Sequence, residues 1–320
     1  MKVLVTGATG LVGQAIVKVL RSKDIDVNYL TRNKNKITSS EGYHGYYWNP
    51  EKGEMDLDVL KDVSAVINLA GASISNRWTN TYKKKVLNSR IDSLMTLHQG
   101  FQQVDTSRIT SFVTASAIGI YPNSLTHFYD ESEKQIDSSF LGEVVDEWEK
   151  AADRFRNFDF KTAKVRIGLV LANSGGALPK MARPVQGFVG AAFGSGEQWQ
   201  SWIHVDDLAE MFVFLIENNL KGTYNGVAPN PVTQSKMIKT LGKVLNRPIW
   251  LPNIPKFVMK GLLGEMSYLL FASQRVSSKR IEKKGFDFQY PNLEAALENL
   301  YGKNMPENES QISNVHNGLA

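Results

Sequence analysis

A glycine-rich segment near the start of the chain constrains the fold more than any other feature. Residues 2–6 are a short apolar run typical of a buried strand, and Gly7, Gly10 and Gly13 follow it at once. In a strand–loop–helix unit the first glycine makes a tight turn, the second lets the backbone approach a pyrophosphate, and the third packs helix against strand. The free N–H groups at the helix start favour an anion. The predicted dinucleotide contacts are Gly7, Thr9, Gly10, Leu11, Val12 and Gly13.

The end of the second predicted strand, residues 26–30, distinguishes NAD from NADP. An NAD-specific site places an acidic residue on the ribose 2′-hydroxyl about 20 residues beyond the glycine loop. Here Thr31 and Arg32 occupy that place, with Lys34 and Lys36 close behind. Arg32 can clamp a 2′-phosphate with paired hydrogen bonds, and Thr31 adds a hydroxyl. We therefore expect NADP(H) to be preferred over NAD(H); the alternative is that Arg32 is only a surface residue.

Strand-type and helical segments alternate along the first part of the chain. The predicted strands are 2–6, 26–30, 65–69, 111–114 and 164–171, and the amphipathic helical segments are 13–22, 82–103, 141–155 and 205–218. This alternation predicts an α/β fold with a Rossmann-type, doubly wound parallel sheet.

The predicted domain organisation has three parts. Residues 1–225 form the dinucleotide-binding domain, with glycine-rich substrate-side loops from about residue 175. Residues 226–302 form a smaller, mostly helical substrate-side domain, which includes a helix over 232–245 opened by Thr233. The tail, 303–320, carries few apolar residues and is expected to be disordered.

Composition excludes several classes of function. The chain has no cysteine, which removes disulfides and thiolate catalysis. No apolar run reaches the ~20 residues that span a bilayer, and no signal peptide is visible, so we expect a cytoplasmic protein without a membrane partner. The net charge of +5 is spread over 37 basic and 32 acidic residues, which does not favour nucleic acid. Phosphate-loop, nucleophile-elbow and metal-binding motifs are absent, so we expect no metal site.

Motifs beyond the glycine loop carry a resemblance to a known family. They are Asn68-Leu69-Ala70-Gly71, Ser116-Ala117-Ile118-Gly119-Ile120-Tyr121, Trp148-Glu149-Lys150-Ala151-Ala152, Arg166-Ile167-Gly168-Leu169, Gly175-Gly176-Ala177-Leu178-Pro179-Lys180-Met181, Trp202-Ile203-His204-Val205-Asp206-Asp207 and, near the C-terminus, Leu263-Gly264-Glu265-Met266 and Gln274-Arg275-Val276. With them the chain resembles the extended, atypical short-chain dehydrogenase/reductase superfamily. More narrowly, it resembles the "epimerase family protein" group of NAD-dependent epimerases/dehydratases with a C-terminal domain of unknown function. The resemblance covers residues 1 to about 300.

The resemblance implies further cofactor contacts. Asn68, Leu69, Ala70 and Gly71 are expected to line the path of the adenine ribose and pyrophosphate. Arg90 resembles a contact to phosphate or ribose, with a surface ion pair as the alternative. Leu169 falls where relatives flank the nicotinamide.

One part of the superfamily pattern is missing. A Ser or Thr, a Tyr and a Lys four residues after the Tyr form the usual catalytic set, but none of the eleven tyrosines has a lysine at that spacing. Aligned on Glu149, the Tyr and Lys positions fall near Leu141 and Val145, which cannot transfer a proton.

Other side chains are candidates for that chemistry. Ser116 occupies the place of the superfamily hydroxyl, and Tyr121 is a candidate replacement phenol. We interpret Glu143 and Glu147 as a solvated helix face and His204 as structural. Asp206 and Asp207 are expected to cap the following helix.

Two hypotheses of different classes follow. The chain is an NADP(H)-dependent oxidoreductase or epimerase-like enzyme with an atypical proton donor and an unknown small-molecule substrate. Alternatively, it is a non-catalytic NADP(H)-binding sensor or interaction protein. Superfamily members often dimerise, so a homodimer is possible in either case.

Overall fold

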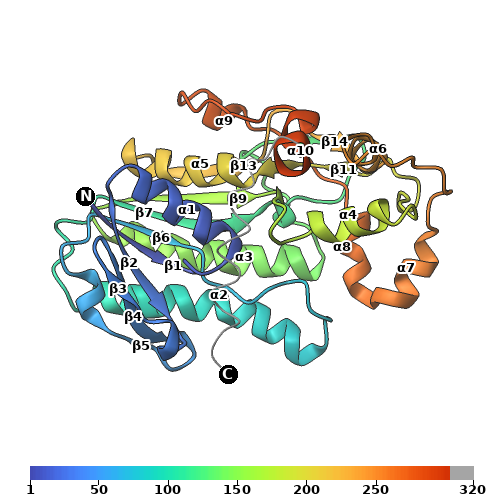
Figure 1. Cartoon of the computed structure of the whole chain (residues 1–320). Coiled ribbons are helices and arrows are strands. Elements are labelled where there is room, and N and C mark those ends of the chain that lie inside the picture. The colour runs from blue at the N-terminus through green and yellow to red at the C-terminus, as the bar shows by residue number, and fades with distance from the viewer. Residues whose placement is uncertain (303–320) are drawn as a thin grey trace, which may run out of the picture.

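The computed structural model describes residues 1–302; the predicted disordered tail, 303–320, lies outside the described residues. A central sheet runs through the molecule (Figure 1), with parallel strands in the order β13, β9, β7, β6, β1, β2 and β4 and with the short β3 and β5 antiparallel to β4. The strands of this sheet are β1 (Lys2–Thr6), β2 (Asp26–Thr31), β3 (Ser39–Ser40), β4 (Tyr43–Asn49), β5 (Glu54–Met55), β6 (Ala65–Asn68), β7 (Ser111–Ala117), β9 (Lys161–Ile167) and β13 (Gly222–Gly226). The predicted Rossmann-type sheet is confirmed.

Helices cover both faces of the sheet (Figure 1). Helices α1 (Leu11–Ser22) and α5 (Val205–Glu217) pack together on one face, and α2 (Asn80–Phe101) and α3 (Phe140–Asp153) pack together on the other. Side chains fix where helices start: the Thr79 hydroxyl accepts a hydrogen bond from the Tyr82 N–H at 3.1 Å and opens α2. Thr233 opens α6 (Gln234–Val244) in the same way, as predicted.

Strand β1 occupies the turning point of the sheet. Its residues pair with β2 on one side and with β6 on the other, so that Thr6 stands between Leu30 and Asn68. Doubly wound sheets bind ligands beyond the carboxyl ends of their strands at such a point. The glycine loop after β1 therefore lies where a dinucleotide is expected.

The predicted strand 164–171 is two strands. Strand β9 stays in the main sheet, whereas β10 (Leu169–Leu171) leaves it to pair with β12 (Trp202–His204). Gly168 lies between them, and a Cβ there would come within 2.3 Å of the Ser201 carbonyl oxygen. This close approach separates the two strands, and an unbroken apolar run does not reveal it.

Strand β4 was not predicted. Its sequence contains Gly45, where a Cβ would come within 2.5 Å of the Tyr29 ring. That ring stacks on Tyr43 at 4.5 Å between centroids. Gly45 makes room for an aromatic side chain on β2. Because glycine stands at this position, the sequence of β4 lacks the apolar alternation by which a strand is recognised.

The remaining elements are short strands, helices and 3₁₀ turns outside the central sheet. Short sheets join β8 (Phe128–Tyr129) to β15 (Arg275–Val276) and β11 (Trp199–Gln200) to β14 (Val232–Thr233). The helices are α4 (Leu178–Gln186), α7 (Lys256–Leu263), α8 (Tyr268–Phe271), α9 (Lys279–Glu282) and α10 (Leu293–Tyr301), with short 3₁₀ turns at Lys34–Lys36, Pro50–Lys52, Leu57–Leu60, Ile118–Ile120, Arg154–Asn157 and Gly264–Ser267.

Two main cores hold these parts together. One lies between the central sheet and its helices and also takes in Ile281 and Phe286 from the C-terminal part. The other lies among α4, α6 and α10 around Trp202. The predicted domain boundaries stay predictions. Within residues 1–302, no helix combines the length and apolar character that crossing a bilayer requires.

Candidate cofactor site

The glycine loop has the geometry that its spacing predicts. Gly7 has φ +69°, a left-handed conformation that favours glycine. A Cβ at Gly13 would lie 2.1 Å from the Gly7 carbonyl oxygen, so helix α1 can approach the loop only with glycine there. The Gly10 N–H donates to that same oxygen at 2.9 Å, which closes the turn.

The start of α1 leaves donors free for an anion. Gly10 is the N-cap residue and provides no capping side chain, and no acidic residue occupies the first turn. The N–H groups of Leu11, Val12 and Gly13 have no acceptor within the helix. Thr9 and Gly10 are exposed. Positive helix-end potential and open N–H groups together suit a pyrophosphate.

A second loop, which contains Gly176, approaches the start of α1. Gly176, at φ +75°, lies so close to Leu11 that a Cβ would come within 3.2 Å of the Leu11 Cδ2 atom. This loop follows β10, the strand that begins at Leu169, whose N–H donates to the Ser201 carbonyl at 2.8 Å. The predicted residue Leu169 thus leads into a segment that packs over the start of α1.

Thr31 and Arg32 lie at the end of β2, beside the glycine loop. Thr31 is buried, and its hydroxyl accepts from the Asn33 N–H at 3.2 Å. The Arg32 side chain is 59% exposed and pairs with Glu51 at 3.3 Å. An exposed pair of this kind contributes little stability. The guanidinium can therefore leave Glu51 for a stronger anionic partner.

A buried polar ladder supports the loop after β6. Thr6 donates to the Asn68 side-chain oxygen at 2.7 Å, and Asn68 donates to the Thr114 hydroxyl at 3.1 Å. The N–H groups of Leu69 and Ala70 both donate to the Thr6 hydroxyl. The ladder joins the ends of β1, β6 and β7. The Asn68 side chain is buried and bonded to both neighbours in this ladder, and its predicted cofactor contact stays a prediction.

Arg90 braces that loop from α2. Its Nη1 donates to the carbonyls of Ala72 at 3.2 Å and Val86 at 2.8 Å, and its guanidinium lies 4.9 Å from the centroid of the Trp148 ring. A Cβ at Gly71 would come within 3.2 Å of the Arg90 side chain. Burial lowers the pKa of Arg90 to about 10, so it stays charged near neutral pH. Among residues 1–302, no carboxylate pairs with it.

Ser116 and Tyr121 belong to one buried hydrogen-bond network. Ser116 donates to Glu149 at 2.7 Å, and Arg166 holds the two oxygens of Glu149 at 2.8 and 3.0 Å. Tyr121 donates to the Asn225 side-chain oxygen at 2.7 Å and accepts from Arg166 at 2.9 Å. The network joins β7, α3, β9 and β13, so each hydroxyl is already used by protein atoms.

Burial sets the ionisation of this network. It raises the pKa of Tyr121 to about 12, although Arg166 opposes the shift. Burial also acts to raise the pKa of Glu149, but hydrogen bonds and charge from Arg166, with Lys164, outweigh it and hold the pKa below its usual value. Near neutral pH the phenol is protonated and the carboxylate ionised. A catalytic role for Ser116 or Tyr121 stays a prediction.

The positions aligned with the missing Tyr and Lys are apolar and packed. Leu141 and Val145 lie against the turn at Gly119, where a Cβ would come within 3.4 and 3.9 Å of their side chains. Glu143 on the same helix is exposed, and Glu147 pairs with Lys150 at 2.7 Å. These glutamates form the expected solvated face.

His204 caps α5. Its Nδ1 accepts from the Asp206 N–H at 3.1 Å, and its ring packs on Tyr290 with centroids 4.1 Å apart. Burial lowers its pKa, against the pull of Asp206. The expectation that Asp206 and Asp207 cap this helix is wrong, because both lie inside its first turn. The Asp207 carboxylate instead accepts from the N–H groups of Gln289 and Tyr290, at 2.8 and 3.0 Å, and so ties the C-terminal part to α5.

Sequence reasoning missed the ionic core of the network. Lys164 and Arg166 lie two residues apart in a strand, and therefore on one face of it. Lys164 pairs with Glu149 at 3.2 Å and with Asp153 at 2.9 Å. The predicted strand 164–171 is apolar apart from these two cations. They could have indicated a buried ion-pair network, because a buried charge requires a partner.

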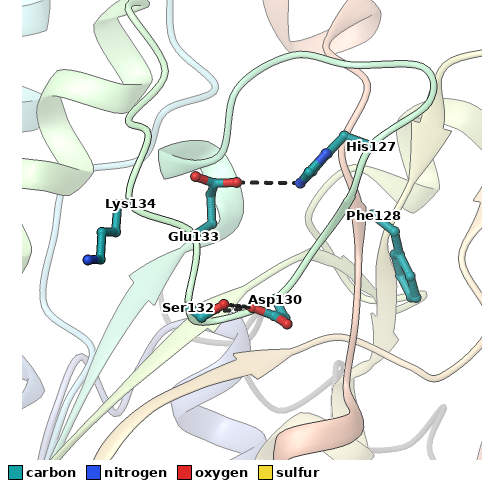
Figure 2. Close-up of a pocket in the computed structure, with 6 residues that line it drawn as sticks. All are labelled: His127, Phe128, Asp130, Ser132, Glu133 and Lys134. Carbon is teal, nitrogen blue, oxygen red and sulfur yellow. Dashed lines mark hydrogen bonds and ion pairs between the residues drawn. The ribbon is translucent and has the colours of Figure 1, made fainter.

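A separate surface hollow of about 510 Å³ lies along the loop 127–134. Figure 2 shows His127 and Glu133 pointing toward each other, at 3.4 Å between their closest nitrogen and oxygen, while Lys134 and Phe128 lie on opposite sides. Asp130 accepts from the Ser132 N–H at 2.8 Å. The lining comes from one continuous segment whose polar groups bond to each other, so we assign it no ligand.

Comparison with known proteins supports the resemblance inferred from the motifs. The sequence matches the NAD dependent epimerase/dehydratase family over residues 3–140 and 170–226, and a domain of unknown function, DUF1731, over residues 254–300. It is 39% identical to an epimerase family protein of Staphylococcus haemolyticus over 300 residues, which cover 93% of this chain and 98% of the relative.

Solved structures of epimerase family proteins are also similar to this chain. The human epimerase family protein SDR39U1, crystallised with NADPH, has a TM-score of 0.84 and 30% identity and covers 95% of this chain and all of its own. A nucleoside-diphosphate sugar epimerase from Corynebacterium glutamicum has a TM-score of 0.75 and 26% identity, covering 100% of this chain and 62% of its own.

Proposed function

We propose that this chain, which belongs to the NAD dependent epimerase/dehydratase family, binds NADP(H) in preference to NAD(H). The observation that carries the preference is Arg32, an exposed cation at the end of β2 where NAD-specific sites place an acid. The related human protein crystallised with NADPH supports it.

The proposed pose follows from the site. The pyrophosphate lies on the N–H groups at the start of α1, under the loop at Gly176. The 2′-phosphate lies against Arg32 and Thr31, and the side of the cofactor toward β6 runs along Leu69, Ala70 and Gly71. Arg90 supplies positive charge from beneath this loop. Because no carboxylate of residues 1–302 pairs with Arg90, an anionic ligand is its natural counter-charge.

Calorimetric titration of the chain with NADPH, NADP⁺, NADH and NAD⁺ tests the preference. We expect the two phosphorylated cofactors to bind at least about tenfold more tightly, from the charge-assisted contacts to the 2′-phosphate. Dissociation constants within a factor of two across the four would contradict the proposal.

We further propose that the chain is an NADP(H)-dependent oxidoreductase or epimerase-like enzyme acting on a small molecule bound between the sheet domain and the C-terminal part. The loop-rich segment after β10 supports a shaped pocket on that side. Trp199 is half-buried there, whereas Trp202 lies fully buried in the core among α4, α6 and α10. Hydride transfer needs a proton donor other than the usual Tyr–Lys pair. A cytoplasmic setting and a homodimer also stay predictions.

A specific observation favours the alternative, a non-catalytic NADP(H) sensor. Leu141 and Val145 are apolar and packed where the proton-transfer pair is expected, and the hydroxyls of Ser116 and Tyr121 are bonded inside the protein. Screening carbonyl compounds and sugar nucleotides for a substrate-dependent change at the nicotinamide absorbance band separates the two. Turnover supports the enzyme, whereas tight binding without turnover and a partner that distinguishes NADPH from NADP⁺ support the sensor.

A further inference from the structure

Helix α7 buries none of its residues, although five of its eight are apolar. Phe257 is 75% exposed and Leu262 is 73% exposed. The apolar side chains of an amphipathic helix are normally covered, and large exposed apolar patches mark binding faces. The exposed apolar side chains of α7 therefore indicate a binding surface.

The loop that leads into α7 and a second loop that it touches also expose apolar side chains. Trp250 is 68% exposed, and Phe188 and Val189 are 50% and 57% exposed. The loops touch, because a Cβ at Gly190 would come within 2.9 Å of the Ile249 side chain. Figure 1 shows α7, α4 and α6 at the end of the molecule away from the N-terminus. We call this set the apolar end: Phe188, Val189, Trp250, Phe257 and Leu262.

Basic residues outnumber acidic ones in and beside the apolar end, where Glu197 and Glu265 are the nearest acidic residues in the sequence. Residues 245–264 contain Arg247, Lys256 and Lys260 and no acidic residue, and residues 186–196 contain no charged residue. Arg247 lies 4.7 Å from the centroid of the Phe188 ring, and Lys256 lies 5.4 Å from that of Phe271. The cations are thus interleaved with aromatic side chains.

Of the acidic residues adjoining this end, Glu197 is exposed, whereas Glu265 and Glu294 are paired. Glu265, which follows α7, pairs with Lys83 on α2. Glu294 on α10 pairs with Lys243 on α6. The apolar end therefore presents hydrophobic side chains with an excess of basic residues around them.

We propose that the apolar end docks on an anionic lipid surface. Phe257, Leu262 and Trp250 enter the boundary between headgroups and acyl chains, and the cations lie against the headgroups. Charge complementarity favours this occupant over a second copy, because a symmetric dimer through this face would bring Lys256 and Lys260 against themselves. We expected no membrane partner because the sequence contains no segment long enough to span a bilayer. Docking on the surface of a membrane does not need such a segment.

Vesicle flotation of the whole chain tests the proposal, with phosphatidylcholine alone and with phosphatidylcholine and phosphatidylglycerol in equal parts. We expect binding to the anionic vesicles that weakens as salt is added. The double variant Phe257→Ser, Leu262→Ser should lower partitioning about 100-fold, from the apolar burial of two large side chains. The double variant Lys256→Gln, Lys260→Gln should lower it about 30-fold, from two headgroup contacts.

Ile37→Ser serves as the matched control, because Ile37 is exposed on the connection after β2. It should bind vesicles as the unchanged chain does. The thermal midpoint and the NADPH affinity of every variant should stay unchanged, which excludes unfolding as the cause of lost binding. Failure to bind anionic vesicles at low salt would overturn the proposal. So would equal binding by the Phe257 and Leu262 double variant, or self-association through this face without lipid binding.

Discussion

Arg166 on β9 holds both carboxylate oxygens of Glu149 on α3, at 2.8 and 3.0 Å, with the two side chains only 9% exposed. Breaking a buried pair costs more than its net contribution, because the remaining charge stays buried without a partner. Glu149→Gln should therefore lower the free energy of unfolding by about 3 kcal/mol. Urea denaturation measures it. Glu147→Gln removes a half-exposed partner of Lys150 on the same helix and should cost less than about 1 kcal/mol; equal losses in the two variants would contradict the assignment.

Gly13→Ala tests the approach of α1 to the glycine loop. A methyl group 2.1 Å from the Gly7 carbonyl oxygen must displace the helix start. We expect NADPH affinity to fall about 100-fold or more as the anion-binding N–H groups move. Gly261→Ala on α7 is the control, because no atom lies within 4 Å of its added Cβ. Calorimetric titration that found Gly13→Ala no weaker than Gly261→Ala would show that this contact does not shape the site.

Arg90→Met separates the stabilising role of Arg90 from its proposed role toward the cofactor. Methionine keeps apolar contact with Trp148 but removes the charge. We expect NADPH affinity to fall about tenfold at low salt, and by less at high salt as screening grows. Melting curves with and without NADPH measure this. The control is Arg154→Met, because Arg154 is an exposed arginine just after α3. In this control, NADPH should raise the melting temperature as much as in the unchanged chain. The same full rise in Arg90→Met would show that Arg90 does not contribute to the site.

His204 predicts a loss of stability on acidification. Burial lowers its pKa in the folded state below the usual value of 6.5, so the unfolded chain binds the proton more readily. Stability is then fully present above about pH 6.5 and falls as the pH drops toward the lowered folded value. His204→Asn keeps a capping side chain and should flatten this slope between pH 7.5 and 5.5 in denaturation experiments. The exposed His127→Asn should not, and an unchanged slope in His204→Asn would refute the account.

The fold was largely predictable, because β1, α1, β2 and α5 each carry a local pattern of strand, glycine loop or amphipathic helix. The break at Gly168 was not, since it depends on a contact with Ser201, far along the chain. Strand β4 escaped for a related reason: Gly45 makes room for Tyr29 on another strand. Local patterns encode elements, whereas such close approaches exist only once the chain is folded.

The conformation of the glycine loop was predictable as well. The spacing of Gly7, Gly10 and Gly13 predicts the loop, and the structure requires glycine at two of them: Gly7 has a left-handed backbone, and a Cβ at Gly13 would collide with the Gly7 carbonyl oxygen. The network of Ser116, Glu149 and Arg166 was not assembled in advance, because its members come from three elements and meet only through the sheet register that pairs Ser116 with Arg166.

Arg32→Ala tests the central claim, an NADP(H) site, most directly. The measurement is the ratio of the NADH and NADPH dissociation constants in the unchanged chain, in Arg32→Ala, and in Arg108→Ala, whose exposed arginine pairs with Asp62 away from the site. We predict that Arg32→Ala weakens NADPH binding about tenfold or more while leaving NADH binding unchanged, so that the ratio collapses. Arg108→Ala should keep the original ratio. Dissociation constants for the two cofactors within a factor of two in the unchanged chain, with neither altered by Arg32→Ala, would contradict the account.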